Sequence, residues 1–284
     1  MNPSPFILVY KKKLYEGVNL FKIKAPRVAK VAEPGQFIII KLTEFGERIP
    51  LTIADFDRDS GTVMILVQEA GKTTTELGMF NEGDAIMDVA GPFGKPSDIE
   101  YFGNVVCIGG GFGIAAIHPI ARALKEKNNN VISIIGARKK ELLIMENEMK
   151  KASTVVLVAT DDGSYGTKGF ATDVLKKLID EGSKIDYCLA IGPVPMMKAV
   201  TQITKQHNIK TSVSLNSIMI DATGMCGGCR VSIDGKRKFA CVDGPEFDGS
   251  QVDFDELLKR QKIYQAKEKE SMERFLEKCK LYGR

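Results

Sequence analysis

Residues 105–114 read Val-Val-Cys-Ile-Gly-Gly-Gly-Phe-Gly-Ile, and this stretch decides the fold of the chain. It runs from an apolar segment through a glycine-rich loop into the helical pattern of residues 114–127. A buried strand that turns into a helix through glycines is typical of nucleotide-binding sheets, because the glycines let the backbone approach a pyrophosphate and the helix offers free N–H groups. A tight turn made only for packing is the alternative interpretation of this loop.

Three further apolar segments follow, at residues 131–135, 154–159 and 187–191, with helical patterns between them. Continuous apolar strands that alternate with helices indicate a doubly wound parallel sheet. Such a sheet binds its ligand beyond the carboxyl ends of the strands. The residues expected at those ends are Gly109, Gly110, Gly111, Phe112, Gly113, Arg138, Asp161, Asp162 and Gly192.

The same strand ends bear on the choice of nicotinamide nucleotide. The usual acidic partner of the adenosine ribose, about 20 residues after the glycine loop, is replaced by Arg138 and two lysines. Arg138 would accept a 2′-phosphate and favour NADP, whereas Asp161 and Asp162 would repel a phosphate and suit the free hydroxyls of NAD. Both interpretations stay open from the residues alone, and we favour NAD(H).

The first 90 or so residues have a different pattern, with short strands separated by turns. Residues 37–42 and 62–67 are examples, the second following an Asp-Ser-Gly turn. Several short strands at regular spacing predict a small antiparallel barrel. The turn-rich stretch of residues 91–96, Gly-Pro-Phe-Gly-Lys-Pro, is the best candidate for the end of this part.

Two stretches of the barrel carry candidate binding residues. In Arg48-Ile-Pro-Leu-Thr52 the arginine would grip a pyrophosphate and Thr52 would hydrogen-bond a flavin ring nitrogen, although exposed arginines on strands are common. A second stretch, Gly71, Lys72, Thr73 and Thr74, enters a short helix and would hold phosphate through N–H groups, hydroxyls and the lysine. An ordinary capped helix is the alternative for this second stretch.

Near the C-terminus a cysteine frame is present with one substitution. Plant-type [2Fe–2S] proteins use C-x4-C-x2-C followed by a distant cysteine. Here Cys226, Cys229 and Cys241 keep that frame, but Asp221 stands in the first position. A four-ligand site therefore needs a non-cysteine ligand or a distant thiol. Zinc held by three cysteines and an aspartate, or Asp221 as a simple turn residue, are the alternatives.

The composition bounds the class of protein. A chain of 284 residues suits two domains and an appendage. Its net charge of +4 is small and no basic run is interleaved with aromatics, so we expect no nucleic-acid partner. No segment is long and apolar enough to span a membrane, and no signal-peptide pattern is present. We therefore expect a cytoplasmic protein without a membrane partner, whose cysteines serve as ligands rather than disulfides.

The motifs in this order, over nearly the whole chain, resemble the ferredoxin–NADP reductase superfamily. Within it the chain is similar to the electron-transfer subunits of dihydroorotate dehydrogenases. It is most similar to the small (alpha) subunits of NADH-dependent, electron-bifurcating ferredoxin:NADP+ oxidoreductases. Asp221 separates these two groups, because the dihydroorotate type is expected to have cysteine in that position and the bifurcating type has aspartate.

The resemblance implies an NAD(H)-linked flavin oxidoreductase subunit in which flavin and nicotinamide, rather than a catalytic side chain, carry the chemistry. It implies FAD in the barrel, NAD(H) on the parallel sheet and a [2Fe–2S] cluster near the C-terminus. The flavin residues would be Arg48, Pro50, Leu51 and Thr52, and the cluster ligands Asp221, Cys226, Cys229 and Cys241.

The resemblance also implies a partner and a division of the chain. The partner is a larger subunit with FAD and iron–sulfur clusters, in a heterodimer that ferredoxin reaches only through the complex. We expect an FAD-binding barrel over residues 1–97, an NAD(H)-binding part over 98–220, a cluster segment over 221–252 and a helical tail over 253–284. The tail would pack either on the partner or on the chain itself.

Two other functions stay open. One is an electron-transfer subunit of dihydroorotate dehydrogenase or of a soluble hydrogenase, and the other is a zinc-containing nucleotide-binding regulator without a redox role. Among single residues, His118 follows an apolar helical turn and is expected to be a packed helical histidine without a catalytic role.

Overall fold

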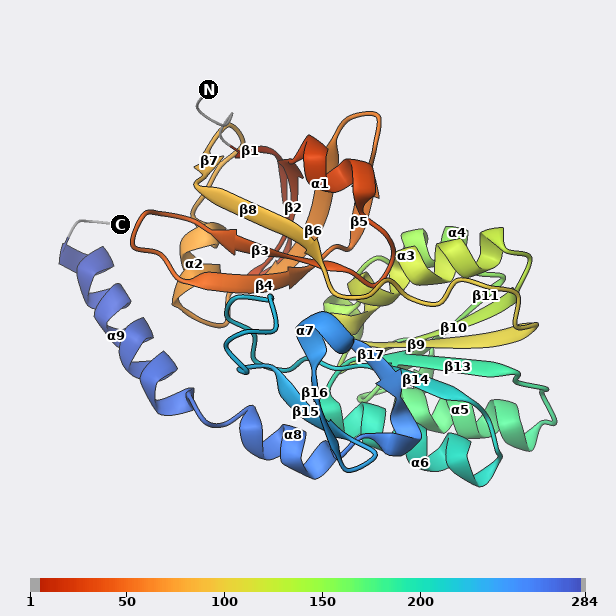
Figure 1. Cartoon of the computed structure of the whole chain (residues 1–284). Helices are drawn as coiled ribbons and strands as arrows, with labels where there is room; N and C mark the ends of the chain where they lie inside the picture. Colours follow the sequence, from red (N-terminus) through yellow and green to blue (C-terminus); the bar gives the residue numbers. More distant parts are fainter. Residues whose placement is uncertain (1–5, 282–284) are drawn as a thin grey trace.

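The computed structural model describes residues 6–281. Antiparallel strands of the N-terminal part lie beside a parallel sheet with helices on its faces, and the cysteine segment lies between them (Figure 1). Helix α9 (Gln265–Leu281) extends away from the parallel sheet. Within the described part of the chain, no helix has the length and apolar character needed to cross a membrane.

The expected barrel is built from two antiparallel sheets that share one core. One has the strand order β5-β6-β2-β1-β7 and the other β4-β3-β8, so the described strands do not join into one closed sheet. Phe21, Ile38 and Ile65 are fully buried in the shared core. The elements are β1 (Phe6–Tyr15), β2 (Val18–Lys24), α1 (Pro26–Val31), β3 (Phe37–Lys41), β4 (Arg48–Thr52), β5 (Asp55–Asp57), β6 (Thr62–Gln68), α2 (Lys72–Gly78), β7 (Ala85–Ile86) and β8 (Asp88–Phe93).

The second part is the predicted doubly wound sheet, with strand order β12-β11-β10-β9-β13-β14-β17. Helices α3 and α4 pack on one face, and α5 and α6 on the other. The elements are β9 (Asn104–Gly110), α3 (Gly113–Glu126), β10 (Asn130–Ala137), η1 (Lys140–Leu142), α4 (Glu146–Ala152), β11 (Val155–Thr160), β12 (Thr167–Lys168), α5 (Ala171–Asp180), β13 (Tyr187–Ile191), α6 (Val194–Gln206) and β14 (Thr211–Ser214).

The chain then forms the cysteine segment and returns to the sheet. Strand β17 pairs antiparallel with β14, so the last strand of the seven-stranded sheet comes after the cysteines in sequence. The domain boundaries expected from the sequence stay a prediction. The elements are β15 (Arg230–Ile233), β16 (Lys236–Phe239), α7 (Ala240–Asp243), β17 (Glu246–Asp248), η2 (Gly249–Gln251) and α8 (Phe254–Arg260), followed by α9.

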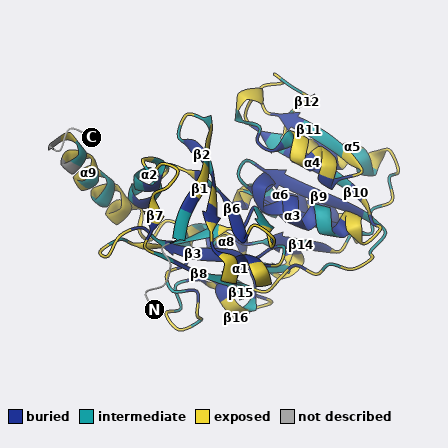
Figure 2. Ribbon diagram, turned by 90° about the horizontal axis from the view of Figure 1, so that it is seen from above, coloured by how far each residue is buried: buried dark blue, intermediate teal, exposed yellow. Residues whose placement is uncertain are grey.

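Burial differs sharply between the sheet and the tail (Figure 2). The central strand β9 is buried almost throughout, which explains its continuous apolar sequence. Helix α9 is mostly exposed and lies beside α2 of the barrel, where the Ser271 hydroxyl donates to Glu47 Oε1 at 3.5 Å. The tail therefore contacts its own chain only lightly.

Glu246 lies where the barrel linker and the returning strand meet. It pairs with Ser214 across β14 and β17, and its Oε1 accepts a hydrogen bond from the Ser97 hydroxyl. Close by, the Lys95 N–H donates to the Gly244 carbonyl at 2.6 Å. Burial raises the pKa of the Glu246 carboxyl to about 7, so this junction favours the protonated acid.

This carboxyl predicts a pH-dependent stability. The unfolded carboxyl ionises near 4.5 and the folded one near 7, so the free energy of unfolding falls as pH rises through this window. Glu246→Gln keeps an acceptor for Ser97 and does not ionise. We expect the variant to gain up to about 3 kcal/mol over the wild type between pH 4.5 and pH 8, measured by urea unfolding. Equal pH profiles for the variant and for the exposed control Glu181→Gln would contradict the assignment.

Candidate functional site

The glycine-rich loop lies at the switch point of the sheet, where the strand order reverses between β9 and β13. A Cβ on Gly113 would lie 2.0 Å from the Ile191 carbonyl oxygen, so α3 starts in direct contact with β13. Gly111 has a φ of +54° and its N–H donates to the Gly136 carbonyl at 2.9 Å. A Cβ on Gly111 would meet no atom within 4 Å. The loop therefore borders open space, as a bound pyrophosphate requires.

The other predicted strand-end residues gather at the same edge of the sheet. A Cβ on Gly192 would lie 3.1 Å from the Gly110 carbonyl oxygen, so the loops after β9 and β13 touch. Beyond the neighbouring strands, the Asp162 N–H donates to the Arg138 carbonyl at 3.2 Å. Arg138, Asp161 and Asp162 are all exposed. The fold thus brings these residues together, and their contacts with a nucleotide stay a prediction.

The predicted flavin residues Arg48, Pro50, Leu51 and Thr52 all belong to strand β4. Thr52 is exposed at the end of that strand, while Pro50 and Leu51 are half-buried. Arg48 Nη1 lies 3.1 Å from Asp88 Oδ2 of β8 in an exposed ion pair. A surface pair of this kind contributes about 0–1 kcal/mol, so a pyrophosphate contact would readily replace it.

The stretch Gly71 to Thr74 enters helix α2 as expected, but two of its hydroxyls are already engaged. The Thr73 hydroxyl donates to Glu47 Oε2 at 2.6 Å, and Thr74 Oγ1 accepts from the Gly71 N–H at 3.0 Å. The Lys72 side chain and the backbone N–H groups after Gly71 remain for the phosphate contact that the sequence predicts here. The Thr74 hydroxyl thus stabilises the start of the helix, while the Thr73 hydroxyl joins the helix to Glu47.

The predicted cluster ligands form an exposed side and a buried side. Cys229 and Cys241 are almost fully buried, with their sulfurs 3.1 Å apart. Cys226 is exposed, and its N–H donates to Asp221 Oδ2 at 3.1 Å. The other carboxylate oxygen accepts from the Thr223 N–H at 2.9 Å. This bond, together with those from Cys226, holds the pKa of the Asp221 carboxyl below its usual range, so the side chain is an anionic donor at neutral pH.

This donor set fits a two-iron cluster. A two-iron cluster divides its four ligands between two irons. The two neighbouring pairs, Cys229 with Cys241 and Asp221 with Cys226, match that division.

The cysteine segment packs on the barrel. Cys229 and Cys241 share a buried apolar cluster with Phe37 and Ile39 of β3. Strand β3 is hydrogen-bonded to β4, with Ile39 opposite Pro50 and Phe37 opposite Thr52. One strand therefore separates the predicted cluster ligands from the predicted flavin strand.

Two polar atoms outside the predicted site residues support bound cofactors. Thr75 Oγ1 in α2 and Ser217 Oγ in the loop after β14 are buried and have no hydrogen-bond partner. Buried hydroxyls without partners are uncommon, and a bound ligand is one cause. The run of three threonines, residues 73–75, indicates a polar site, but the sequence does not distinguish Thr75 from Thr73 and Thr74. Nothing in the sequence around Ser217 distinguishes it from an ordinary loop serine.

Comparison with known proteins defines the class. A family model for the iron–sulfur cluster binding domain of dihydroorotate dehydrogenase B matches residues 216–253. A ferredoxin NADP+ reductase from Neisseria gonorrhoeae, solved with bound FAD and NADP, has a TM-score of 0.60 at 16% identity, over 76% of this chain and 92% of that chain. This likeness shows that the chain has the ferredoxin–NADP reductase fold, as predicted.

Nearer relatives define the family. A Thermotoga maritima protein, described as the electron transfer subunit homolog of dihydroorotate dehydrogenase B (NAD(+)), is 54% identical over 95% of each chain. A chain of the NADH-dependent reduced ferredoxin-NADP oxidoreductase, whose structure gave insights into flavin-based electron bifurcation, has a TM-score of 0.91 at 52% identity over 97% of this chain and 100% of that chain. This chain belongs to the family of dihydroorotate dehydrogenase B electron-transfer subunits. The expectations of family, fold class and iron–sulfur cofactor are confirmed.

The glycine loop predicts two different costs for one added methyl group. In Gly113→Ala the new Cβ would collide with the β13 backbone, and we expect a loss of about 3 kcal/mol in the free energy of unfolding. In Gly111→Ala the Cβ meets open space and only the positive φ is penalised, at about 1 kcal/mol. Urea unfolding of both variants tests this. Equal losses would mean that α3 does not rest on β13 as described.

Proposed function

We propose that this chain is an FAD- and [2Fe–2S]-containing electron-transfer subunit that exchanges hydride with NAD(H). It passes single electrons to a partner subunit of a flavin-based electron-bifurcating ferredoxin:NADP oxidoreductase. The 52% identity and full coverage of a chain from the NADH-dependent reduced ferredoxin-NADP oxidoreductase support this choice. So does Asp221 in the first position of the cysteine frame.

The observation that carries the proposal is the packing of the cysteine segment on strand β3. The side chains of Phe37 and Ile39 touch the cluster segment, while the backbone of the same residues pairs with Thr52 and Pro50 of the predicted flavin strand. When bound, the flavin would take a hydride from NADH and release its two electrons singly to the iron–sulfur cluster. The residues of β3 and β4 hold the two groups in adjacent places.

Each predicted residue then has a role in binding or orientation. Arg48, Thr52 and Lys72 hold the flavin nucleotide, the loop of residues 109–113 holds the pyrophosphate of NAD(H), and the strand ends after β10 and β11 hold its ribose. Cys226 is exposed, and so are the apolar side chains of Ile220 and Met225, which precede it in the same loop. An exposed apolar border around a ligand suits docking of the larger subunit, with ferredoxin reached through the complex.

The alternative is an electron-transfer subunit of dihydroorotate dehydrogenase, which the family match of residues 216–253 favours. Co-purification separates the two. A large FAD subunit with [4Fe–4S] clusters supports the bifurcating complex, and an FMN barrel subunit supports the alternative. We also propose a cytoplasmic location, because the sequence predicts cysteines that serve as ligands rather than disulfides, as a reducing compartment favours.

The proposed reaction is tested by anaerobic titration with NADH. We expect bleaching of the flavin absorbance and, in the same sample, the EPR signal of a reduced [2Fe–2S] cluster. Both follow from one electron path inside the chain. A colourless protein that contains zinc, or a flavin that NADH does not bleach, would overturn the proposal.

The aspartate ligand is tested by Asp221→Cys. Replacing a carboxylate by the more electron-donating thiolate changes the ligand field and hydrogen bonding of one iron, so both the g-values and the midpoint potential should move. Asp243→Asn is the matched control, since this aspartate accepts a hydrogen bond from the Phe239 N–H in the same segment and is not a predicted ligand. Spectra of Asp221→Cys that equal those of the control would remove Asp221 from the coordination sphere.

A further inference from the structure

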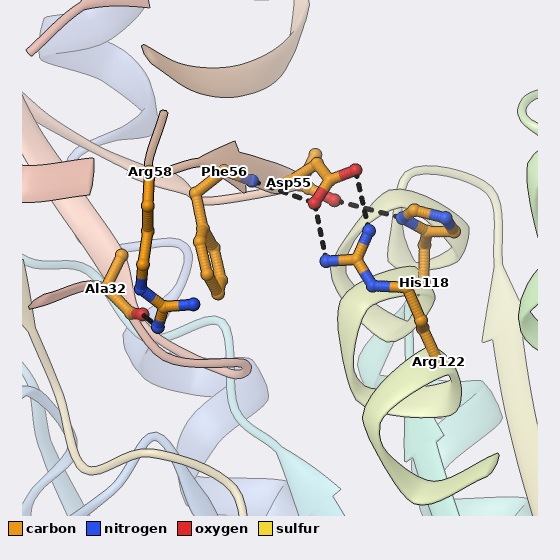
Figure 3. A network of polar contacts seen from close by, with 7 residues as sticks. Ala32, Asp55, Phe56, Arg58, His118 and Arg122 are labelled. Atoms are coloured by element: carbon orange, nitrogen blue, oxygen red, sulfur yellow. Dashed lines mark hydrogen bonds and ion pairs between the residues drawn. The ribbon is translucent and has the colours of Figure 1, made fainter. Parts of the chain in front are cut away.

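An ion pair joins the barrel to the nucleotide-binding helix. The Asp55 carboxylate at the start of β5 receives two hydrogen bonds from the Arg122 guanidinium of α3, Nη1 to Oδ2 at 3.0 Å and Nη2 to Oδ1 at 2.7 Å. Figure 3 shows the arginine reaching from the helix to the strand. The Arg122 side chain is 36% exposed and the Asp55 side chain is 27% exposed, so solvent only partly screens this bidentate pair.

A buried histidine adds a second contact one helical turn earlier. His118, which comes from the same helix as Arg122 (Figure 3), is 5% exposed. Its Nδ1 lies 3.2 Å from the carbonyl oxygen of Ala54, the residue before Asp55. Burial lowers the pKa of His118, which keeps the imidazole neutral, and the neutral ring donates its Nδ1–H to that carbonyl. Two side chains on one face of α3 therefore hold two successive residues of the barrel.

Apolar packing encloses this contact. Ala54 is 1% exposed and belongs to the same buried cluster as the α3 residues Ile114 and Ile117. Met64 and Leu66 of the barrel strand β6 pack against that cluster. The barrel thus rests on α3 through an interface in which Asp55, Arg122 and His118 supply the directional bonds.

These bonds lie close in sequence to both predicted cofactor-binding segments. Asp55 follows closely on Thr52, the end of the predicted flavin strand, and His118 lies little more than one helical turn beyond Gly113, the end of the nucleotide loop. The bonds therefore join the two short segments that would carry the flavin and the nicotinamide nucleotide. Hydride transfer needs its two reacting atoms within a fraction of an ångström of the right separation.

We propose that Asp55, Arg122 and His118 form an inter-lobe latch, which joins the barrel (one lobe) to the parallel sheet and its helices (the other lobe). The latch positions the nicotinamide against the flavin. The inference rests on the proposed function for its two cofactors. These are positioning residues, since they act through β4 and α3. The hydrogen bonds of Ser97 with Glu246 and of Lys95 with Gly244 form a second connection between the lobes. Loss of the latch therefore lets the lobes change their relative orientation while they stay in contact.

The test compares Arg122→Gln with Arg58→Gln in the full chain loaded with its cofactors. Arg58 is the matched control, because its guanidinium lies 4.8 Å from the Phe56 ring and donates to the Ala32 carbonyl at 2.9 Å, all within the barrel (Figure 3). Asp55→Asn serves as a milder second variant that keeps the side-chain volume and one acceptor oxygen.

We expect Arg122→Gln to slow the reduction of flavin by saturating NADH about tenfold or more in stopped-flow experiments, with weaker charge-transfer absorbance. Its Kd for NADH and its reduction by dithionite should stay close to the wild-type values, and the control should match the wild type throughout. The double variant Asp55→Asn/Arg122→Gln should be no slower than Arg122→Gln, because both changes break one pair.

Hydrogen exchange supplies a readout that does not depend on turnover. In Arg122→Gln the amides of residues 53–57 and of α3 should exchange about threefold or more faster, and in Arg58→Gln they should not. Flavin reduction as fast in Arg122→Gln and Asp55→Asn as in the control would overturn the latch, and so would a change confined to the Kd for NADH. If NADH does not reduce the flavin of the wild-type protein, the proposed function is overturned instead. The hydrogen-exchange data would then still test whether the Asp55–Arg122 pair holds residues 53–57 to α3.

Discussion

The arrangement of the predicted cofactor sites depends on strand β3, which is buried on both faces. Successive side chains of a strand point to opposite sides. Ile38 and Ile40 accordingly pack in the barrel core, while Phe37 and Ile39 pack against the cysteine segment. The backbone of β3 meanwhile pairs with β4. The uninterrupted apolar run of β3 is thus the physical reason that the cysteine segment, the barrel core and the predicted flavin strand meet at one place.

Features that depend on neighbouring residues could be predicted from the sequence, and pairings between distant residues could not. The glycine loop, the strand–helix alternation and the cysteine frame are local patterns, and the fold confirms the first two. The Asp55–Arg122 pair joins residues 67 apart, and the Ser97–Glu246 bond joins residues 149 apart. A chain with 40 basic and 36 acidic residues offers many such pairs, and only the packing of the lobes selects among them. The roles of Thr73 and Thr74 stay a prediction, and the structure adds that their hydroxyls already donate to Glu47 and to the Gly71 carbonyl.

Asp221 has a role in the loop as well as in the proposed ligand set. Its two oxygens accept hydrogen bonds from the Thr223 and Cys226 N–H groups, so the carboxylate organises the backbone that leads to the first cysteine. A side chain with two acceptor oxygens can do this and still offer a lone pair to iron. A thiolate is a weaker acceptor, so an aspartate in this position shapes the loop in a way that cysteine does not.

The return of the chain to the sheet through β17 makes the cysteine segment an insertion rather than an appendage. Strands β14 and β17, which flank it, are hydrogen-bonded to each other, so both ends of the segment are anchored side by side. An anchored loop loses less conformational entropy on ordering than a free tail. In evolutionary terms, such a segment can lengthen, change its ligands or vary its tip while the parent sheet stays intact. It cannot be removed together with β17 without exposing the edge of β14, which would then be open to pairing with other chains.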